Sequence, residues 1–373
     1  MAEIKGLSAH NRPPEKVRDV FKKYQRYQAS EVGSDPDIID LQKLDPDEPP
    51  ESIALDGWMS SKDLRRAFHE FVKGENASSA EPSGGFFEDI PIFTHRSVSA
   101  TGLRLIPSLF PPTVQKELLS RLFHRDLSDP RHQTNVHLHY NVTYPDSPKS
   151  RGDDDKEEKD EKEEEKEARS DDQQPRASFF QADPGLVLSP KDPEAHKPIT
   201  IQNFLEKKLR WITLGGQYNW TTKEYPAGPP PAFPQDIARL LRAAFPETEP
   251  QAAIVNVYSA GDTLSMHRDV SEECDSGLIS VSFGCDGLFV VSHDDGEGCE
   301  VIRLRSGDAI YMAGRSRFAW HGVPKVLPST CPTWLQDWPG PDYEYWRGWM
   351  GGKRVNLNVR QMNDVDENGA LEH

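Results

Sequence analysis

Three side chains in the last third of the chain have the types and spacing of a metal site. His267 and Asp269 are two positions apart, so in an extended strand both point to the same face. His321 ends an apolar run, whereas His293 lies in a polar turn, and we therefore choose His321 as the third ligand. Two histidines and one carboxylate, with further positions left open, form the ligand set of non-haem Fe(II) oxygenases. The spacing predicts an iron site.

A second group of polar residues follows in the run Arg354-Val355-Asn356-Leu357-Asn358-Val359-Arg360. Polar and aliphatic residues alternate, which predicts a strand with both arginines on one face. The two arginine Cα atoms would lie about 20 Å apart, and inward-leaning side chains would leave a gap for a small dianion. The planar guanidinium binds carboxylates with two hydrogen bonds, so a dicarboxylate fits. Beside an iron site, this indicates a dioxygenase that consumes 2-oxoglutarate.

Each feature alone has an ordinary explanation. A His-x-Asp pair occurs by chance in many chains of this length. Arginines on one face of a strand often mark a solvated sheet edge. The interpretation depends on the joint occurrence, in this order, of the His-x-Asp pair, the later histidine and the closing arginine strand.

The same segments resemble a known family. The runs NVYSAGDTLSMHRD, SRFAWHG and RVNLNVR are similar to those of the AlkB-like Fe(II)/2-oxoglutarate dioxygenases, and Leu209–Thr213 and HGVPKVLP are most similar to the eukaryotic AlkB homologue 1 branch. The resemblance implies that Fe(II) is bound by His267, Asp269 and His321, and that O₂ is the second substrate. The implied site for 2-oxoglutarate contains Asn256, Tyr258, Arg354, Asn356 and Arg360.

Within that implied site, the resemblance assigns different ends of 2-oxoglutarate to the two arginines. Arg354, with Asn256 and Tyr258, would hold the carboxylate far from the metal, and Arg360 would serve the end near the metal. The chain departs from the bacterial pattern, which has an acid two residues after the metal aspartate. Ser271 occupies that position here and Glu272 follows it, so base selectivity does not carry over.

An aromatic and basic segment precedes the metal residues and suggests a place for nucleic acid. Lys207, Lys208 and Arg210 are followed by aromatic residues that could stack on a flipped base. These candidate substrate-binding residues are Trp211, Tyr218 and Trp220. The alternative is that the aromatic side chains belong to the core.

Composition limits the partners and the compartment. The formal net charge is −17, and the run from Asp153 to Asp172, with 13 acidic and 5 basic residues, carries −8 of it. A basic protein partner for this run is one interpretation, and a tolerated surface insertion is the other. The four cysteines show no paired spacing, and the chain has no apolar run near 18 residues. We expect no membrane span and an intracellular location, in nucleus or cytoplasm, with the mitochondrion as the alternative.

The pattern of elements predicts a mostly β fold with flanking helices, built on a double-stranded β-helix, or jelly roll. We expect five regions. These are a helical extension with acidic linkers (1–85), the first part of the catalytic domain (86–146), a disordered acidic insert (147–190), the dioxygenase core (191–362) and a C-terminal tail (363–373).

The resemblance implies oxidative demethylation of N-methylated bases in DNA or tRNA, with release of formaldehyde, succinate and CO₂. Two alternatives remain open from the sequence. The same iron chemistry could act on a protein side chain, because the metal and cosubstrate motifs do not encode the substrate. The fold could also be a binding module without catalysis, but such a module would not need all three ligands and both arginines.

Overall fold

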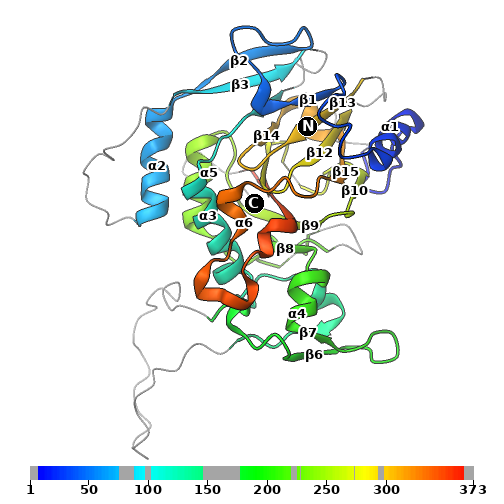
Figure 1. Cartoon of the computed structure of the whole chain (residues 1–373), viewed down its shortest axis with the longest axis vertical. Coiled ribbons are helices and arrows are strands. Elements are labelled where there is room, and N and C mark those ends of the chain that lie inside the picture. Colours follow the sequence, from blue (N-terminus) through cyan, green and yellow to red (C-terminus); the bar gives the residue numbers. More distant parts are fainter. Residues whose placement is uncertain are drawn as a thin grey trace, which may run out of the picture.

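Two β-sheets packed on a shared apolar core form the framework of the protein (Figure 1). The computed structural model describes residues 7–74, 88–96, 102–145, 177–219, 225–226, 228–272, 274–292 and 298–364. The major sheet contains, in spatial order, β2 (Ile53–Met59), β3 (Ile90–His95), β4 (Leu103–Ile106), β14 (Ala309–Met312), β11 (Leu278–Gly284), β16 (Lys353–Arg360), β9 (Ala252–Ser259) and β8 (Trp211–Gly215). The minor sheet contains β1 (Ile38–Asp40), β13 (Cys299–Leu304), β12 (Gly287–Ser292), β15 (Trp320–Val326) and β10 (Leu264–His267). This confirms the predicted jelly-roll core.

Helices and a small third sheet surround this core. The third sheet contains β5 (Tyr140–Asn141), β6 (Val187–Pro190) and β7 (Ile199–Thr200). The α-helices are α1 (Glu15–Arg26), α2 (Ser61–Lys73), α3 (Pro112–Ser120), α4 (Ile201–Asn203), α5 (Gln235–Ala244) and α6 (Thr333–Gln336). Short 3₁₀-helical segments are η1 (Leu41–Lys43), η4 (Asn135–Leu138), η5 (Phe179–Gln181), η7 (Gly314–Phe318), η8 (Pro341–Trp346) and η9 (Trp349–Gly352). Segments η3 (Arg121–Asp126) and η6 (Phe204–Lys208) are π-helical.

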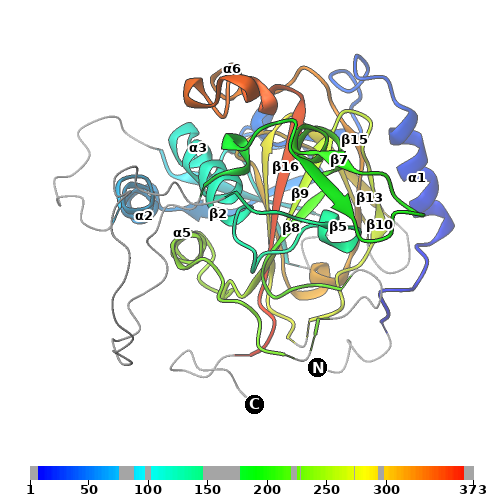
Figure 2. The ribbon, with the colours of Figure 1, turned by 90° about the horizontal axis from the view of Figure 1, so that it is seen from below.

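The helices cover different faces of the sandwich. Helices α2, α3 and α5 lie together on the major-sheet side, while α1 contacts β10, β12 and β15 of the minor sheet (Figures 1 and 2). Among the residues that the structure describes, no helix is both long enough and apolar enough to cross a lipid bilayer.

Strand β16 has the alternation that the sequence predicts. It lies between β9 and β11 in antiparallel register, and all eight of its residues are buried. Val355, Leu357 and Val359 belong to the main apolar cluster. The arginine and asparagine side chains point to the opposite face, because side-chain direction alternates along a strand. The middle of the major sheet therefore presents a buried polar row to the interior of the sandwich.

The N-terminal region contains short strands as well as the two helices of the expected extension. Residues 38–40, predicted as linker, form β1 and pair in parallel with β13, and β2 pairs with β3 at the edge of the major sheet. Ile38 and Ile53 are buried, so short apolar stretches between acidic and proline residues suffice to add strands. The prediction of a linker at residues 38–40 is wrong, because the acidic and proline-rich composition of the surrounding stretch hides a strand of three residues.

The acidic insert is shorter than predicted at its C-terminal end. Residues 146–176 lie outside the described residues. Residues 177–190, expected to be disordered, contain η5 and β6, and Phe179 and Phe180 are almost fully buried in the main core. Burial of the two phenylalanines supplies apolar area that the acidic run lacks, and this offsets the entropy cost of ordering residues 177–190.

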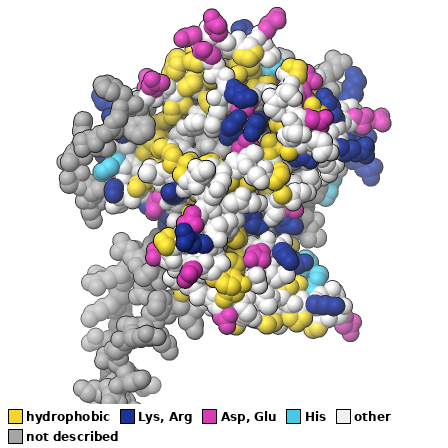
Figure 3. Space-filling view, viewed as in Figure 1, with side chains coloured by type: hydrophobic (Ala, Val, Ile, Leu, Met, Phe, Trp, Pro, Cys, Tyr) yellow, Lys and Arg dark blue, Asp and Glu magenta, His cyan; other side chains and the backbone are white. Residues whose placement is uncertain are grey.

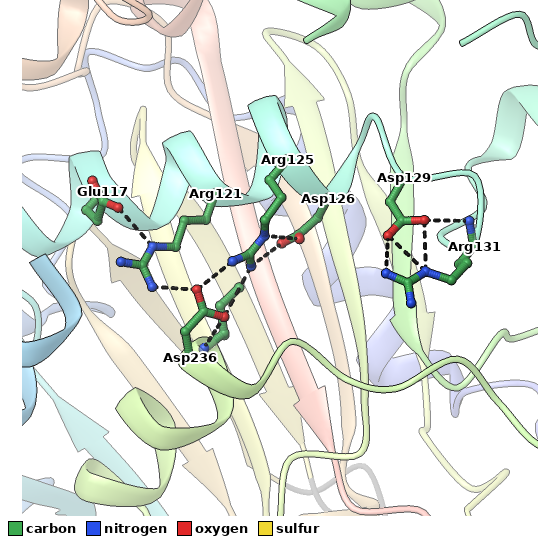
Figure 4. A network of polar contacts seen from close by, with 8 residues as sticks. Glu117, Arg121, Arg125, Asp126, Asp129, Arg131 and Asp236 are labelled. Carbon is green, nitrogen blue, oxygen red and sulfur yellow. Dashed lines mark hydrogen bonds and ion pairs between the residues drawn. The ribbon is translucent and has the colours of Figure 1, made fainter. Parts of the chain in front are cut away.

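A charged network joins the helices on the major-sheet side (Figure 4). Arg121 and Arg125 of η3 both contact Asp236 at the start of α5, and Arg121 Nε also lies 2.8 Å from Glu117 Oε1. Burial alone would raise the pKa of Asp236, but the guanidinium groups of Arg125 and Arg121 hold it below its usual value. The carboxylate of Asp236 therefore fixes α5 against α3 and η3.

We predict that Asp236→Asn lowers the free energy of unfolding by about 1 to 3 kcal/mol, because two arginines lose a charged acceptor. Urea unfolding followed by circular dichroism measures the change. Asp337→Asn is the matched control, because Asp337 pairs with Arg347 on the exposed surface and its loss should leave the midpoint unchanged. Equal midpoints for wild type and Asp236→Asn would contradict the prediction.

Candidate metal centre and adjoining cavities

The three predicted ligands meet in the structure. His267 ends β10, Asp269 follows two residues later, and His321 lies in β15. His267 and His321 are direct partners in the antiparallel pairing of these strands. One ligand atom from each of the three residues lies within 4.8 Å of the other two. Strand pairing therefore brings the histidines together across 54 positions of sequence. The alternative ligand, His293, lies outside the described residues.

Both imidazoles direct the same nitrogen at the shared space. Nδ1 of His267 lies 2.9 Å from the Ser265 carbonyl oxygen, and Nδ1 of His321 lies 3.1 Å from the Ala319 carbonyl oxygen. Because a carbonyl only accepts, Nδ1 carries the proton and Nε2 keeps its lone pair. Each Nε2 lies 3.7 Å from a carboxylate oxygen of Asp269. Burial lowers the pKa of His321 to about 4, so this imidazole is neutral at physiological pH.

Asp269 is held as a carboxylate. Burial alone would raise its pKa, but the Arg360 guanidinium holds it well below the usual range. Nη2 of Arg360 donates to Oδ2 of Asp269 over 2.8 Å. One carboxylate and two imidazole nitrogens converging on one point fit a divalent transition metal such as Fe(II).

Asp269 does not lie in the strand from which we predicted its direction. Strand β10 ends at His267, and Arg268 points instead to the Trp320 ring, 4.4 Å from its centroid. The carboxylate reaches the histidines from the loop because Arg360 fixes it there. The structure places His267 and Asp269 beside each other, and strand periodicity explains only part of this arrangement.

Arg354 is a buried cation with open donors. Its Nη2 donates to Ser282 Oγ over 2.9 Å, while its Nε and Nη1, and the hydroxyl of Tyr258, have no hydrogen-bond partner among the described residues. Burial lowers the pKa of Arg354 and raises the pKa of Tyr258 to about 12. Unsatisfied buried donors are costly, so this site fits an added carboxylate.

A small cavity connects Arg354 to the metal centre. Tyr258, Arg354, Asn356 and His321 all line it. Gly287 allows this arrangement, because a Cβ atom at that position would lie 2.5 Å from Nε of Arg354. Two predicted cosubstrate residues do not line this cavity: Asn256 and Arg360 face a second cavity on the other side of the metal centre.

The second cavity, of about 340 Å³, opens from His267 and Asp269 and forms the mouth of the site. Tyr218 lines it, as expected for a substrate residue. Tyr225 also lines it and packs edge-on against Tyr218 with ring centroids 5.2 Å apart. The sequence analysis missed Tyr225, which follows the candidate aromatic residues within the same loop and belongs to no strand or helix pattern.

The other two candidate substrate residues have different outcomes. Trp211 begins β8 opposite Asn256 and is half-buried, but it is not among the residues that line the mouth. Trp220 lies outside the described residues. The geometry therefore supports Tyr218 alone among the three candidates.

The aromatic segment between His321 and Arg354 does not cover the metal centre. Trp338 and Tyr343 stack on His124 of η3, and Trp349 packs edge-on against Phe123 and Phe180. In Figure 1 this segment, with α6, lies beside α3. The segment buries aromatic area against neighbouring turns.

We predict that Asp269→Ala abolishes binding of Mn²⁺, a redox-stable substitute for Fe(II), because two imidazoles alone give too few ligands. Isothermal titration calorimetry on metal-free protein measures the binding. Asp262→Ala is the control, since Asp262 pairs with Arg210 outside the triad. Wild-type affinity in Asp269→Ala would refute the assignment of the metal ligands.

Comparison with known proteins agrees with this geometry. Residues 181–360 match the model of the 2OG-Fe(II) oxygenase superfamily. The chain is 44% identical to the "N6-methyladenosine RNA demethylase ALKB1" of Pyricularia oryzae, over 96% of this chain and 98% of that one. It is 49% identical to the "N6-methyladenosine RNA demethylase ALKBH" of Cryphonectria parasitica, over 61% of this chain and all of that one.

A more distant relative belongs to the same group. The chain is 44% identical to the "tRNA demethylase abh1" of Schizosaccharomyces pombe, over 44% of this chain and 57% of that one. The family implies Fe(II) and 2-oxoglutarate as cofactor and cosubstrate, which fits the triad and the open donors of Arg354. The chain therefore belongs to the 2OG-Fe(II) oxygenase superfamily and, within it, to the AlkB-like proteins of the AlkB homologue 1 branch.

Proposed function

We propose that the protein is an Fe(II)- and 2-oxoglutarate-dependent dioxygenase that removes methyl groups from N-methylated bases in nucleic acid. The products are formaldehyde, succinate and CO₂. One observation carries the proposal: the His267, Asp269 and His321 triad shares a cavity system with a buried arginine whose donors are open. A chain that had lost catalysis would not retain both halves of such a site.

The residues of the site divide the work of holding the reactants. Bound Fe(II) supplies the activation of O₂, with 2-oxoglutarate as the co-reductant. Arg354 and the Tyr258 hydroxyl anchor the far carboxylate of 2-oxoglutarate through the open donors. Asn356 lines the same cavity and donates to Ser280 Oγ and to the Val281 carbonyl oxygen. Arg360 keeps the Asp269 carboxylate ionised and in place. The narrow cavity between the sheets limits the entry of water around the reacting groups.

The mouth of the site fits a planar base. Tyr218 and Tyr225 provide two aromatic rings beside the metal ligands, and an extruded base is commonly held by such stacking. On the face shown in Figure 3, basic and acidic side chains are interspersed, so the net negative charge of the whole chain does not exclude phosphate contacts.

The names of the relatives guide the choice of first substrate. Two relatives are described as N6-methyladenosine RNA demethylases and one as a tRNA demethylase. We therefore propose RNA, including tRNA, as the substrate class, with N6-methyladenosine tested first and methylated DNA as the comparison.

A panel of RNA, tRNA and DNA oligonucleotides, each with one methylated base, tests the function. Protein loaded with Fe(II), with ascorbate and 2-oxoglutarate, should release succinate and remove the methyl group from at least one RNA substrate, as measured by mass spectrometry. Asp269→Ala should do neither. If wild-type protein shows no methyl loss and no succinate release with any member of the panel, the proposed function is wrong.

We predict that Arg354→Met raises the KM for 2-oxoglutarate by about 100-fold, because a charge-assisted bidentate contact contributes about 3 kcal/mol. The affinity for Mn²⁺ should stay near that of wild type, since Arg354 does not contact the triad residues by any hydrogen bond or ion pair among the described residues. Succinate release as a function of 2-oxoglutarate concentration measures KM. An unchanged KM would show that the far carboxylate is bound elsewhere.

A further inference from the structure

Four charged side chains form a closed ring behind the metal centre. Arg360 contacts Asp269 through Nη2 at 2.8 Å and Glu272 through Nε at 2.9 Å. Arg317 Nη2 donates to the other oxygen of Glu272 at 2.8 Å, and Arg317 Nη1 donates to the backbone oxygen of Asp269 at 2.8 Å. The ring therefore starts and ends on the same metal ligand.

Arg317 occupies the central structural position in this ring. It lies in η7, the turn that leads directly into β15 and His321, and only 1% of its surface is exposed. Its Nε donates to the Ser276 carbonyl oxygen over 3.0 Å, so one guanidinium group holds three acceptors on the segment that follows Asp269. Arg317 thus ties the Asp269 segment to the turn that positions His321.

The charges of the ring balance. Two carboxylates and two guanidinium groups are buried together, and every carboxylate has a guanidinium partner. A buried pair is stable only when its partners are all present, because removing one leaves an uncompensated charge. Without Glu272, Arg360 would be drawn fully to Asp269 and would compete with the metal for its carboxylate. Without Arg317, Glu272 would lose the contact that holds it toward Arg360.

We propose that Arg317 and Glu272 are positioning residues that orient Asp269 for metal binding. The inference rests on the proposed function, since it assumes that the triad binds the catalytic metal. Neither residue belongs to the group of three side chains that could hold the metal. Partners that orient a metal ligand typically change metal affinity by 10- to 100-fold when they are lost. Arg317 and Glu272 therefore influence the metal affinity of the site through Asp269, without binding the metal themselves.

The test compares Mn²⁺ affinity in Arg317→Lys and Glu272→Gln with that of wild type, by calorimetry on metal-free protein. Lysine has a compact ammonium group and lacks the planar fork of three nitrogens with which Arg317 spans its acceptors, and glutamine keeps the shape of Glu272 while removing its charge. We expect each variant to bind Mn²⁺ about tenfold or more weakly. Because Glu272→Gln is nearly isosteric, it carries the test if Arg317→Lys fails to fold.

A control and a double variant separate positioning from general stability. Arg121→Lys disturbs a partly buried ion network away from the site, so it should lower the melting temperature and leave Mn²⁺ affinity unchanged. The double variant should bind Mn²⁺ no more weakly than the weaker single variant, because both residues act through Asp269. Fully additive losses would overturn this shared route.

Failure of this inference can be distinguished from failure of the proposed function. Wild-type Mn²⁺ affinity in both variants would overturn the positioning role while leaving the metal site intact. Absence of Mn²⁺ binding by wild-type protein would instead refute the metal site itself, and with it both proposals.

Discussion

Two fully buried guanidinium groups, on Arg354 and Arg360 of one strand, set the main constraint on this structure. Moving an ion from water into a protein interior costs several kcal/mol even after relaxation. Arg360 offsets that cost with two carboxylates, Asp269 and Glu272. Arg354 donates to the Ser282 hydroxyl and lies 5.3 Å from the centre of the Tyr258 ring, and no carboxylate forms an ion pair with it among the described residues. Strand β16 thus carries one buried guanidinium group that is paired with carboxylates and one that is not, and the second favours binding of an anion.

Strand order explains how one strand can carry both groups. Because β16 lies between β9 and β11, both of its edges are paired, and its aliphatic face is buried in the main core. The alternation in the sequence predicted which side chains share a face of this strand. A strand at the edge of the sheet would have placed the same arginines in water, which was the ordinary alternative. The sequence alone could not decide between these positions, since neighbours in a sheet are distant in the chain.

Other features were less accessible from the sequence for identifiable reasons. His267 and His321 were predictable as residues, but their contact depends on the register of β10 with β15. Strand β1 is three residues long within an acidic stretch, too short for any periodicity. Trp211 and Tyr218 are both aromatic residues shortly after the basic segment, yet of the two only Tyr218 lines the mouth. Trp211 lies in strand β8, whereas Tyr218 lies in the loop after it. No residue pattern predicts the course of that loop.

The ring of charges also bears on how a base is distinguished at the mouth. Glu272 is the first acid after the position where the bacterial pattern has one, and both of its oxygens are engaged by arginines. Its carboxylate is therefore paired within the ring. Ser271 bonds to Tyr218, and burial raises the pKa of that tyrosine, so both side chains are neutral. Beside the charged pairs, Tyr218 and Ser271 thus offer a base an aromatic ring and neutral hydrogen-bonding groups at this mouth.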